Sequence, residues 1–279
     1  MPALVTRFAP SPTGQLHLGH AYAAMVARDL ARSGDGCFLL RFEDIDHTRI
    51  RTEYYGMIEE DLRWLGLDWD GIPLRQSARG EAYASALERL KDLGAVYPCF
   101  CTRRDIEEEI ARMTRAPQGP EGAHYPGSCR QQPTEDRDRR LAEGRQPAWR
   151  LDAAKASRLA GDLEFTDLRH GRIAVEAELL GDVVLARKDI GTSYHLAVVV
   201  DDAFQGVTHV TRGEDLLPST HIHRVLQALL GLPEPRYLHH RLVLDDQGIR
   251  LAKRCDSLSI RSLREAGHSP EELLRRLPR

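Results

Sequence analysis

The sequence has few features of membrane, secreted or nucleic-acid-coating proteins. No apolar run approaches the roughly 20 residues that a membrane-spanning helix needs. The opening residues, MPALVTRFAPS, lack the charged and apolar regions of a secretory signal. Five cysteines in 279 residues are too few, and odd in number, for a disulfide framework, so they suit a reducing compartment. We therefore expect a cytoplasmic protein with no membrane partner.

The chain also has a small net charge and few lysines. The formal net charge is −3, whereas proteins that wrap a long nucleic acid are usually basic. Any contact with RNA must therefore use a local patch of positive charge. Nearly all cations are arginines, and the lysines are Lys91, Lys155, Lys188 and Lys253.

The first fifty residues predict a βαβ unit. Residues 4–9 (LVTRFA) and 37–42 (CFLLRF) are predicted strands, and residues 21–32 carry apolar side chains at helical spacing. Such a unit has parallel strands and a right-handed crossover, and ligands bind beyond the carboxyl ends of its strands. Residues 7–19 and the acidic group 43–46 both lie there.

The rest of the chain alternates predicted helices and strands. Helices are expected at 53–65, at 79–93, at 221–230 and in the tail from 262, and strands at 183–187 and 197–200 (AVVV). The stretch from Pro98 to about Pro147 is rich in Pro, Gly, Arg, Glu and Gln. It is predicted to be an inserted region of weaker regularity.

The stretch RFAPSPTGQLHLGHAYAAM places two histidines and a glycine where the first strand meets the first helix. A helix N-terminus has unpaired N–H groups and attracts phosphate. Gly19 allows a base or ribose to approach the backbone, and His17 and His20 share one face of a helical turn. Both rings can donate to phosphate oxygens as charge develops. On these residues alone, a proline-bent loop with two surface histidines remains an equal alternative.

Further motifs carry a family resemblance. PSPTGxLHLGH resembles the signature of class I aminoacyl-tRNA synthetases, and the preceding APSPTG is typical of their glutamyl/glutaminyl branch. RFEDID, YHLAVVVDDAFQGVTHVTRGEDLLPSTHIH and a lysine motif near residue 253 follow in order. The chain thus resembles the catalytic half of a glutamyl-tRNA synthetase. This resemblance implies an α/β fold: a Rossmann-type parallel-sheet catalytic domain, an inserted zinc-bearing, acceptor-binding region and a short C-terminal helical segment.

The resemblance also implies how the chain is divided. The catalytic domain would comprise residues 1–97 and 188–245, interrupted by the insertion at 98–187. Residues 246–279 would form a KMSKS-like loop and a helical tail. We expect no anticodon-binding domain, because the chain ends shortly after Lys253.

A pocket for glutamate follows from the same resemblance. Guanidinium groups bind carboxylates bidentately, and a carboxylate accepts from an ammonium group. The implied residues are Arg7 and Arg212 for the carboxylates, Glu43 for the ammonium group, Tyr194 for orientation, and Ser11 with the backbone of Ala9 as lining. Taken singly, Arg212 could instead pair with Glu214 or Asp215, and Tyr194 could be a half-buried sheet residue.

The sequence GIRLAKR at 248–254 stands where the second phosphate-binding loop of this family, KMSKS, is expected. Arg250 replaces the first lysine and Ala252 the usual serine, whereas Lys253 keeps the second lysine. The resemblance implies that His17, Gly19, His20 and Lys253 bind ATP with Mg²⁺, and that His17, His20 and Lys253 are catalytic. The alternative is a basic turn before a helix. The two replacements leave loop closure and turnover open.

Three cysteines could form a metal site. Cys99 and Cys101 form a CxC pair, and Cys129 follows a glycine turn. Spacing alone leaves open a zinc site or three reduced cysteines, with Tyr125 or His124 as the fourth ligand. The short relatives of this family, the glutamyl-Q tRNA(Asp) synthetases, have CxC…YxxxC here with tyrosine as a ligand. That match implies one structural Zn²⁺ on Cys99, Cys101, Tyr125 and Cys129.

The resemblance to these short enzymes covers essentially the whole chain and implies the reaction. ATP would activate L-glutamate without tRNA, and the glutamyl group would pass to the cyclopentenediol of queuosine at the wobble position of tRNA(Asp). We expect a monomer that binds RNA through a local arginine patch. Unranked candidates for that patch are Arg103, Arg104, Arg112, Arg115 and Arg130, and solvated surface arginines are the alternative. The alternatives are a truncated glutamyl-tRNA ligase that charges a 3′ end and a non-catalytic paralogue that binds glutamate or RNA.

Overall fold

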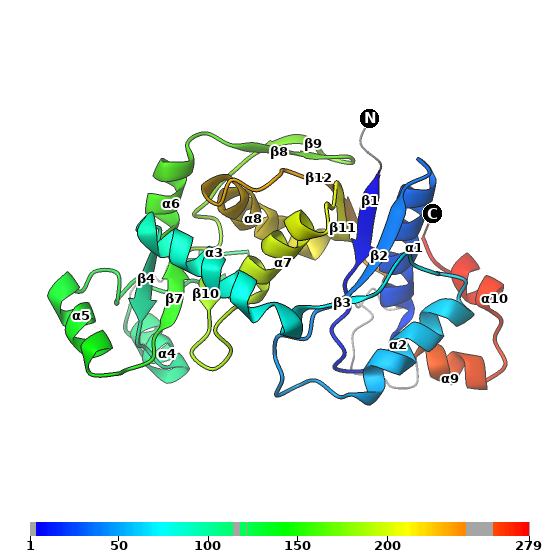
Figure 1. Cartoon of the computed structure of the whole chain (residues 1–279), viewed down its shortest axis with the longest axis horizontal. Helices are drawn as coiled ribbons and strands as arrows, with labels where there is room; N and C mark the ends of the chain where they lie inside the picture. Colours follow the sequence, from blue (N-terminus) through cyan, green and yellow to red (C-terminus); the bar gives the residue numbers. More distant parts are fainter. Residues whose placement is uncertain (1–3, 114–117, 121, 244–258, 279) are drawn as a thin grey trace.

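A parallel sheet forms the centre of the computed structural model, which describes residues 4–113, 118–120, 122–243 and 259–278 (Figure 1). The strands β1 (Val5–Phe8), β2 (Cys37–Phe42) and β3 (Leu74–Arg75) pair in parallel. β11 (His209–Gly213) lies beside β1, where the Thr208 N–H donates to the Val5 carbonyl at 3.0 Å, and β12 (Arg236–His240) pairs in parallel with β11. The order β3-β2-β1-β11-β12 is the Rossmann arrangement, so the expected parallel-sheet fold is confirmed.

The helix α1 (Leu18–Arg32) connects β1 to β2 and packs on the sheet. Its buried face consists mostly of alanines, which let the helix approach the strands closely, and the Thr6 hydroxyl donates to the Ala27 carbonyl at 2.7 Å. The same core includes α2 (Glu53–Trp64) and the C-terminal helices α9 (Ile260–Glu265) and α10 (Pro270–Arg275). The two C-terminal helices therefore pack against the first βαβ unit.

A second core lies on the other side of the molecule (Figure 1). It joins four helices to an antiparallel sheet of order β10-β7-β4. The helices are α3 (Gly80–Asp92), α6 (Ala153–Ala160), α7 (Tyr194–Phe204) and α8 (Leu217–Leu229), and the strands are β4 (Val96–Cys99), β7 (Ala148–Leu151) and β10 (Val184–Ala186).

The segment between β4 and α7 contributes to both sheets. β8 (Glu164–Asp167) pairs in parallel with β12 and antiparallel with β9 (Gly171–Ala174). The other elements are α4 (Arg103–Arg112), β5 (Gln118–Gly119), β6 (Gly122–Ala123), α5 (Thr134–Ala142) and 3₁₀ turns at Gln76–Arg79 and Glu214–Leu216. The domain division expected at 97, 188 and 245 stays a prediction. In the described part of the chain, no helix is both long and apolar enough to cross a bilayer.

The prediction of a strand at 197–200 is wrong, because these residues lie in the middle of α7. The run AVVV is β-branched, which favours a strand, but α7 is packed in the second core with Leu196 to Val199 all buried. A helix that is apolar on nearly every side shows no amphipathic period, so the sequence pattern could not separate it from a buried strand.

The other predicted elements are confirmed to within a few residues. α1 begins three residues earlier than predicted because His17 caps it, and the predicted helix at 221–230 begins at Leu217. The strand at 183–187 is β10, and the helical tail from 262 corresponds to α9 and α10.

Candidate active site

The turn between β1 and α1 orders the two motif histidines. His17 is the N-cap of α1: its Nδ1 accepts from the Gly19 N–H at 3.1 Å, and His20 Nδ1 accepts from the His17 N–H at 3.2 Å. The two rings are stacked with centroids 3.7 Å apart. Because both Nδ1 atoms accept backbone hydrogens, a neutral ring carries its proton on Nε2 in each case. The two histidines therefore share one face with both protons on the same ring position.

The C-terminal segment is attached to this turn. Ser259 forms an antiparallel bridge with His17, and the Ile260 N–H donates to the Leu16 carbonyl at 2.8 Å. Lys253, Arg250 and Ala252 lie outside the described residues. Their proposed contact with ATP phosphates thus stays a prediction.

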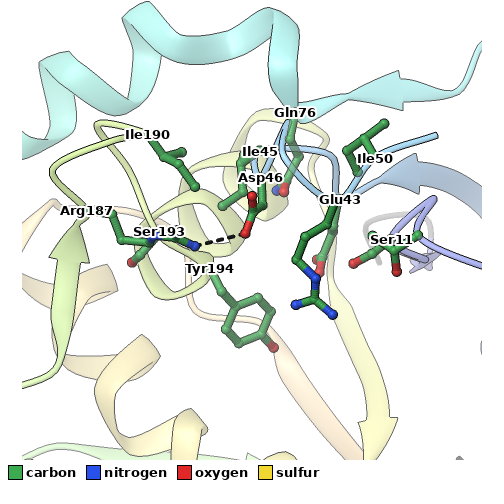
Figure 2. Close-up of a pocket in the computed structure, with 12 residues that line it drawn as sticks. Ser11, Glu43, Ile45, Asp46, Ile50, Gln76, Arg187, Ile190, Ser193 and Tyr194 are labelled. Carbon is green, nitrogen blue, oxygen red and sulfur yellow. Dashed lines mark hydrogen bonds and ion pairs between the residues drawn. The ribbon is translucent and has the colours of Figure 1, made fainter. Parts of the chain in front are cut away.

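A cavity of about 380 Å³ opens at the carboxyl ends of β1 and β2. Figure 2 shows Ser11, Glu43 and Tyr194 along it, contributed by the β1–α1 connection, the end of β2 and the start of α7. An ion pair of 2.9 Å between Arg187 and Asp46 crosses another part of the cavity. The structure thus brings together three residues that the resemblance assigns to glutamate.

Arg7 and Arg212 are not among the residues that line this cavity, although Arg212 contacts the lining residue Tyr194. Arg7 is in β1, directly before Phe8 and Ala9, and Arg212 is in the neighbouring β11. They are 5% and 6% exposed, and Arg7 Nη1 donates to the Thr211 carbonyl at 3.2 Å. The two predicted carboxylate partners are therefore neighbours on adjacent strands, and little of either reaches solvent.

The two arginines have different electrostatic surroundings. Arg7 Nε lies 2.9 Å from Asp202 Oδ1, and the same oxygen lies 2.7 Å from Nη1 of the fully buried Arg41. Arg41 Nη2 lies 3.7 Å from Glu43 Oε1. The guanidinium groups of Arg7 and Arg41 thus face the carboxylates of Asp202 and Glu43, so their positive charges are matched by two negative charges.

Arg212, in contrast, is held by uncharged groups. Its Nη1 donates to the Tyr194 hydroxyl at 3.2 Å and to His223 Nδ1 at 3.0 Å. Its Nη2 donates to Thr220 Oγ1 at 2.5 Å, and its Nε donates to His239 Nε2 at 3.3 Å. Burial raises the pKa of Tyr194, so the phenol keeps its own hydrogen near neutral pH. Among the described residues Arg212 therefore contacts no carboxylate directly, which leaves its charge able to face a carboxylate of glutamate.

Sequence reasoning missed Arg41, Asp201 and Asp202. Asp201 accepts from Gln76 at 2.8 Å and from Tyr83 at 2.6 Å, and this network anchors α7 to α3. A signal was present, since FLLRF and VVVDD place charges inside apolar runs. Charged residues that fold into a core are almost always paired, so these two runs could have been matched to each other.

Burial raises the pKa of Glu43, and the charges of Arg41 and Arg7 offset only part of that effect. Burial also acts to raise the pKa of Asp202, but Arg7 and Arg41 outweigh it and the pKa is lowered. Asp202 therefore stays ionised, whereas Glu43 takes up a proton at a higher pH than an ordinary glutamate.

This shift in Glu43 predicts an acid limb in substrate binding. An ammonium group binds the ionised form only, and the raised pKa means that this form is lost above the ordinary value of 4.5 as pH falls. We expect kcat/KM for glutamate in ATP–pyrophosphate exchange to fall tenfold per pH unit below that pKa. In a Glu43→Gln variant the limb should disappear and the activity should be low at every pH. A wild-type profile flat down to pH 4.5 would contradict the role of Glu43.

The three predicted cysteine ligands converge at the end of β4. The sulfurs of Cys99, Cys101 and Cys129 lie within 4.8 Å of one another. The Tyr125 hydroxyl lies 3.5 Å from the sulfurs of Cys99 and Cys101, and the Arg150 guanidinium covers its ring at 4.0 Å. Three thiols and a phenol within such distances fit a tetrahedral Zn²⁺.

Geometry favours Tyr125 over His124 as the fourth donor. His124 packs against Gly181, and its buried Nε2 has no hydrogen-bond partner among the residues that the structure describes, whereas Tyr125 faces the sulfurs. Gly127, between Tyr125 and Cys129, has φ +89°, a conformation that other residues rarely adopt. Lys188, which follows the cavity residue Arg187 in the sequence, donates from Nζ to the Phe100 carbonyl at 3.0 Å, between Cys99 and Cys101.

Comparison with known proteins identifies the family. The family model for the catalytic domain of class I tRNA synthetases (E and Q) matches residues 3–279. The chain belongs to this class I aminoacyl-tRNA synthetase family. It is 51% identical to the glutamyl-Q tRNA(Asp) synthetase of Rhodobacter capsulatus, over 98% of this chain and 99% of that protein. A protein of the same name from Nocardia farcinica is 46% identical over 96% of this chain and 81% of its own length.

Solved structures agree with this membership. A glutamate tRNA ligase from Elizabethkingia meningosepticum superposes with a TM-score of 0.77 at 28% identity, over 95% of this chain. The chain spans about half of that ligase, 53% of its length. As a member of a family of synthetases, the chain is an enzyme of the ligase class.

Proposed function

We propose that the enzyme activates L-glutamate with ATP, without tRNA, and transfers it to the queuosine of tRNA(Asp). The observation that carries the glutamate step is that Arg212, which contacts no carboxylate among the described residues, donates to Tyr194 at a cavity lined by Glu43 and Tyr194. The relatives named glutamyl-Q tRNA(Asp) synthetase support the choice of acceptor. Neither of these supports a particular set of RNA-contacting arginines.

Each residue then has a defined part in activation. Glu43 holds the ammonium group of glutamate, and Arg7 and Arg212, with Tyr194, are proposed to hold its carboxylates. The α-carboxylate is already ionised near neutral pH, so its oxygen attacks the α-phosphorus without a general base. That P–O bond forms as the bond to pyrophosphate breaks, which gives glutamyl-adenylate.

The β1–α1 turn would bind the nucleotide. The Nε2–H groups of His17 and His20 and the N-terminus of α1 stabilise charge that develops on the phosphates. Gly19 leaves space for the nucleoside, and Lys253 is proposed to bind the leaving pyrophosphate. Mg²⁺, bound with ATP, would neutralise phosphate charge.

In the second step a hydroxyl of the acceptor attacks the activated carbonyl. An ester forms and AMP leaves, so no further reactant is consumed. Cys99, Cys101, Tyr125 and Cys129 would hold a structural Zn²⁺ that stabilises the fold of the segment around them. Because Lys188 connects this segment to the cavity side, the metal site would shape the acceptor entrance.

The test is incubation with ATP, radiolabelled glutamate and queuosine-containing tRNA(Asp), with queuosine-free tRNA(Asp) and tRNA(Glu) as controls. We expect label only in the first RNA, and only in its anticodon fragment after nuclease digestion. Label at the 3′ end of tRNA(Glu) would instead identify a ligase that charges the ordinary acceptor. Absence of glutamate-dependent ATP–pyrophosphate exchange would contradict activation itself.

A further inference from the structure

The side chains around Arg212 are arranged to bind it without neutralising it. All four of its hydrogen bonds go to uncharged groups, and within the described residues it forms no ion pair with a carboxylate. Arg7, on the next strand, has the carboxylate of Asp202 at 2.9 Å. Two arginines at one site thus differ in whether the protein compensates their charge.

The tautomer of His239 explains how Arg212 is held without a carboxylate in direct contact. A guanidinium can only donate, so His239 Nε2 must accept from Arg212 Nε. A carboxylate can only accept, so His239 Nδ1 carries the proton that points to Asp167 Oδ2 at 2.7 Å. The ring is therefore neutral and fixed in orientation, and it separates the carboxylate of Asp167 from the guanidinium.

Asp167 is itself held in place by the backbone. Its Oδ1 accepts from the N–H groups of Arg169 and His170 at 2.8 and 2.9 Å, and its Oδ2 also accepts from the His239 N–H at 3.0 Å. The carboxylate has no freedom to swing toward Arg212. Burial lowers the pKa of His239 to about 4, which agrees with a neutral ring.

His223, like His239, is a neutral ring that accepts a hydrogen bond from Arg212. Its Nδ1 accepts from Arg212, so a neutral ring donates from Nε2 to His195 Nδ1 at 3.2 Å. Burial lowers the pKa of both rings, that of His195 to about 4. Thr220, fully buried, accepts from Arg212 and lies 3.0 Å from His239 Nε2. Every described partner of Arg212 is therefore neutral near pH 7.

We propose that His239 with Asp167, together with Thr220 and His223, is a positioning device that fixes Arg212 while leaving its charge for a substrate carboxylate. The proposal rests on the proposed glutamate activation and deepens it. An amide in place of that carboxylate would leave the buried guanidinium charge unmatched. These positioning residues would therefore make the site bind a substrate carboxylate in preference to the corresponding amide.

Thr220→Asp and Thr220→Asn form a matched pair for the test. The two side chains have the same size, so any steric cost at this buried position is shared, and only the carboxylate can compensate Arg212. Assays at pH 8 lie far above the His239 pKa of about 4 in the wild-type enzyme, which leaves a wide margin for the rise that a carboxylate at position 220 causes. We expect KM for glutamate in pyrophosphate exchange to be about ten- to a hundredfold higher in Thr220→Asp than in Thr220→Asn. KM for ATP should be equal in the pair.

Thermal unfolding of the ligand-free pair gives a readout independent of activity. If the charge of Arg212 is uncompensated, the aspartate variant melts at a higher temperature than the asparagine variant although it binds glutamate more weakly. Equal glutamate KM values, or an aspartate variant that melts no higher, would overturn the positioning device. Wild-type enzyme without glutamate-dependent exchange would overturn the proposed function, while the melting comparison would still test the state of Arg212.

Discussion

Replacement of Arg212 by methionine should lower kcat/KM for glutamate by about a thousandfold, since a buried charge–carboxylate interaction is lost. Methionine fills much of the same volume but leaves Tyr194, His223, Thr220 and His239 without their donor. Glutamate-dependent ATP–pyrophosphate exchange measures the effect.

Arg212→Lys is the matched control for charge alone. Lysine keeps the positive charge, but its ammonium cannot reproduce the planar set of four hydrogen bonds. We expect an intermediate loss, with KM for ATP near the wild-type value in both variants. A methionine variant that keeps kcat/KM for glutamate within about threefold of wild type, which corresponds to less than about 1 kcal/mol, would refute the role of Arg212.

Zinc content should fall from about one ion per chain to almost none in Cys99→Ser. Structural zinc binding is coupled to folding, so the melting temperature should also fall, by about 5–10 °C. Metal analysis of the purified protein and a thermal melt measure the two effects. Retention of stoichiometric zinc in this variant would exclude the cluster as the site.

Three further substitutions make this test specific. Cys37→Ser changes an exposed cysteine remote from the cluster and should leave zinc content unchanged. Tyr125→Phe removes the phenol oxygen near the sulfurs and should weaken zinc affinity, whereas His124→Ala should not. The reverse outcome for the last pair would make His124 the fourth ligand.

The first βαβ unit could be predicted from the sequence because each of its elements carries a local pattern. Residues 37–42 alternate little and are followed by the acidic group 43–46, and the helix before them is amphipathic, so the sequence predicts β2 and α1 nearly at their true bounds. Short strands such as β3 and β8 were not predicted. β3 has only two residues and therefore shows no period. β8 pairs with the nearby β9 in a hairpin, but its sequence, EFTD, has a single large apolar residue, Phe165, so it carries a weak strand signal.

The candidate site was predictable to the extent that the family motif names its residues. That Glu43 and Tyr194 line one cavity, and that Arg7 and Arg212 are neighbours, agrees with the motif. The motif could not distinguish the two arginines, because the difference lies in partners from other elements. Asp202 comes from α7, and His239 from β12, so only the fold shows which charge is compensated.

The Arg7–Asp202–Arg41 cluster has a consequence for folding during synthesis. Asp202 follows Arg7 by 195 positions and Arg41 by 161. While the first two strands emerge from the ribosome, both guanidinium groups lack the carboxylate that later joins them, so they stay hydrated. The sheet can close around them only after α7 is made, and we expect the substrate pocket to be among the last parts of the nascent chain to become rigid.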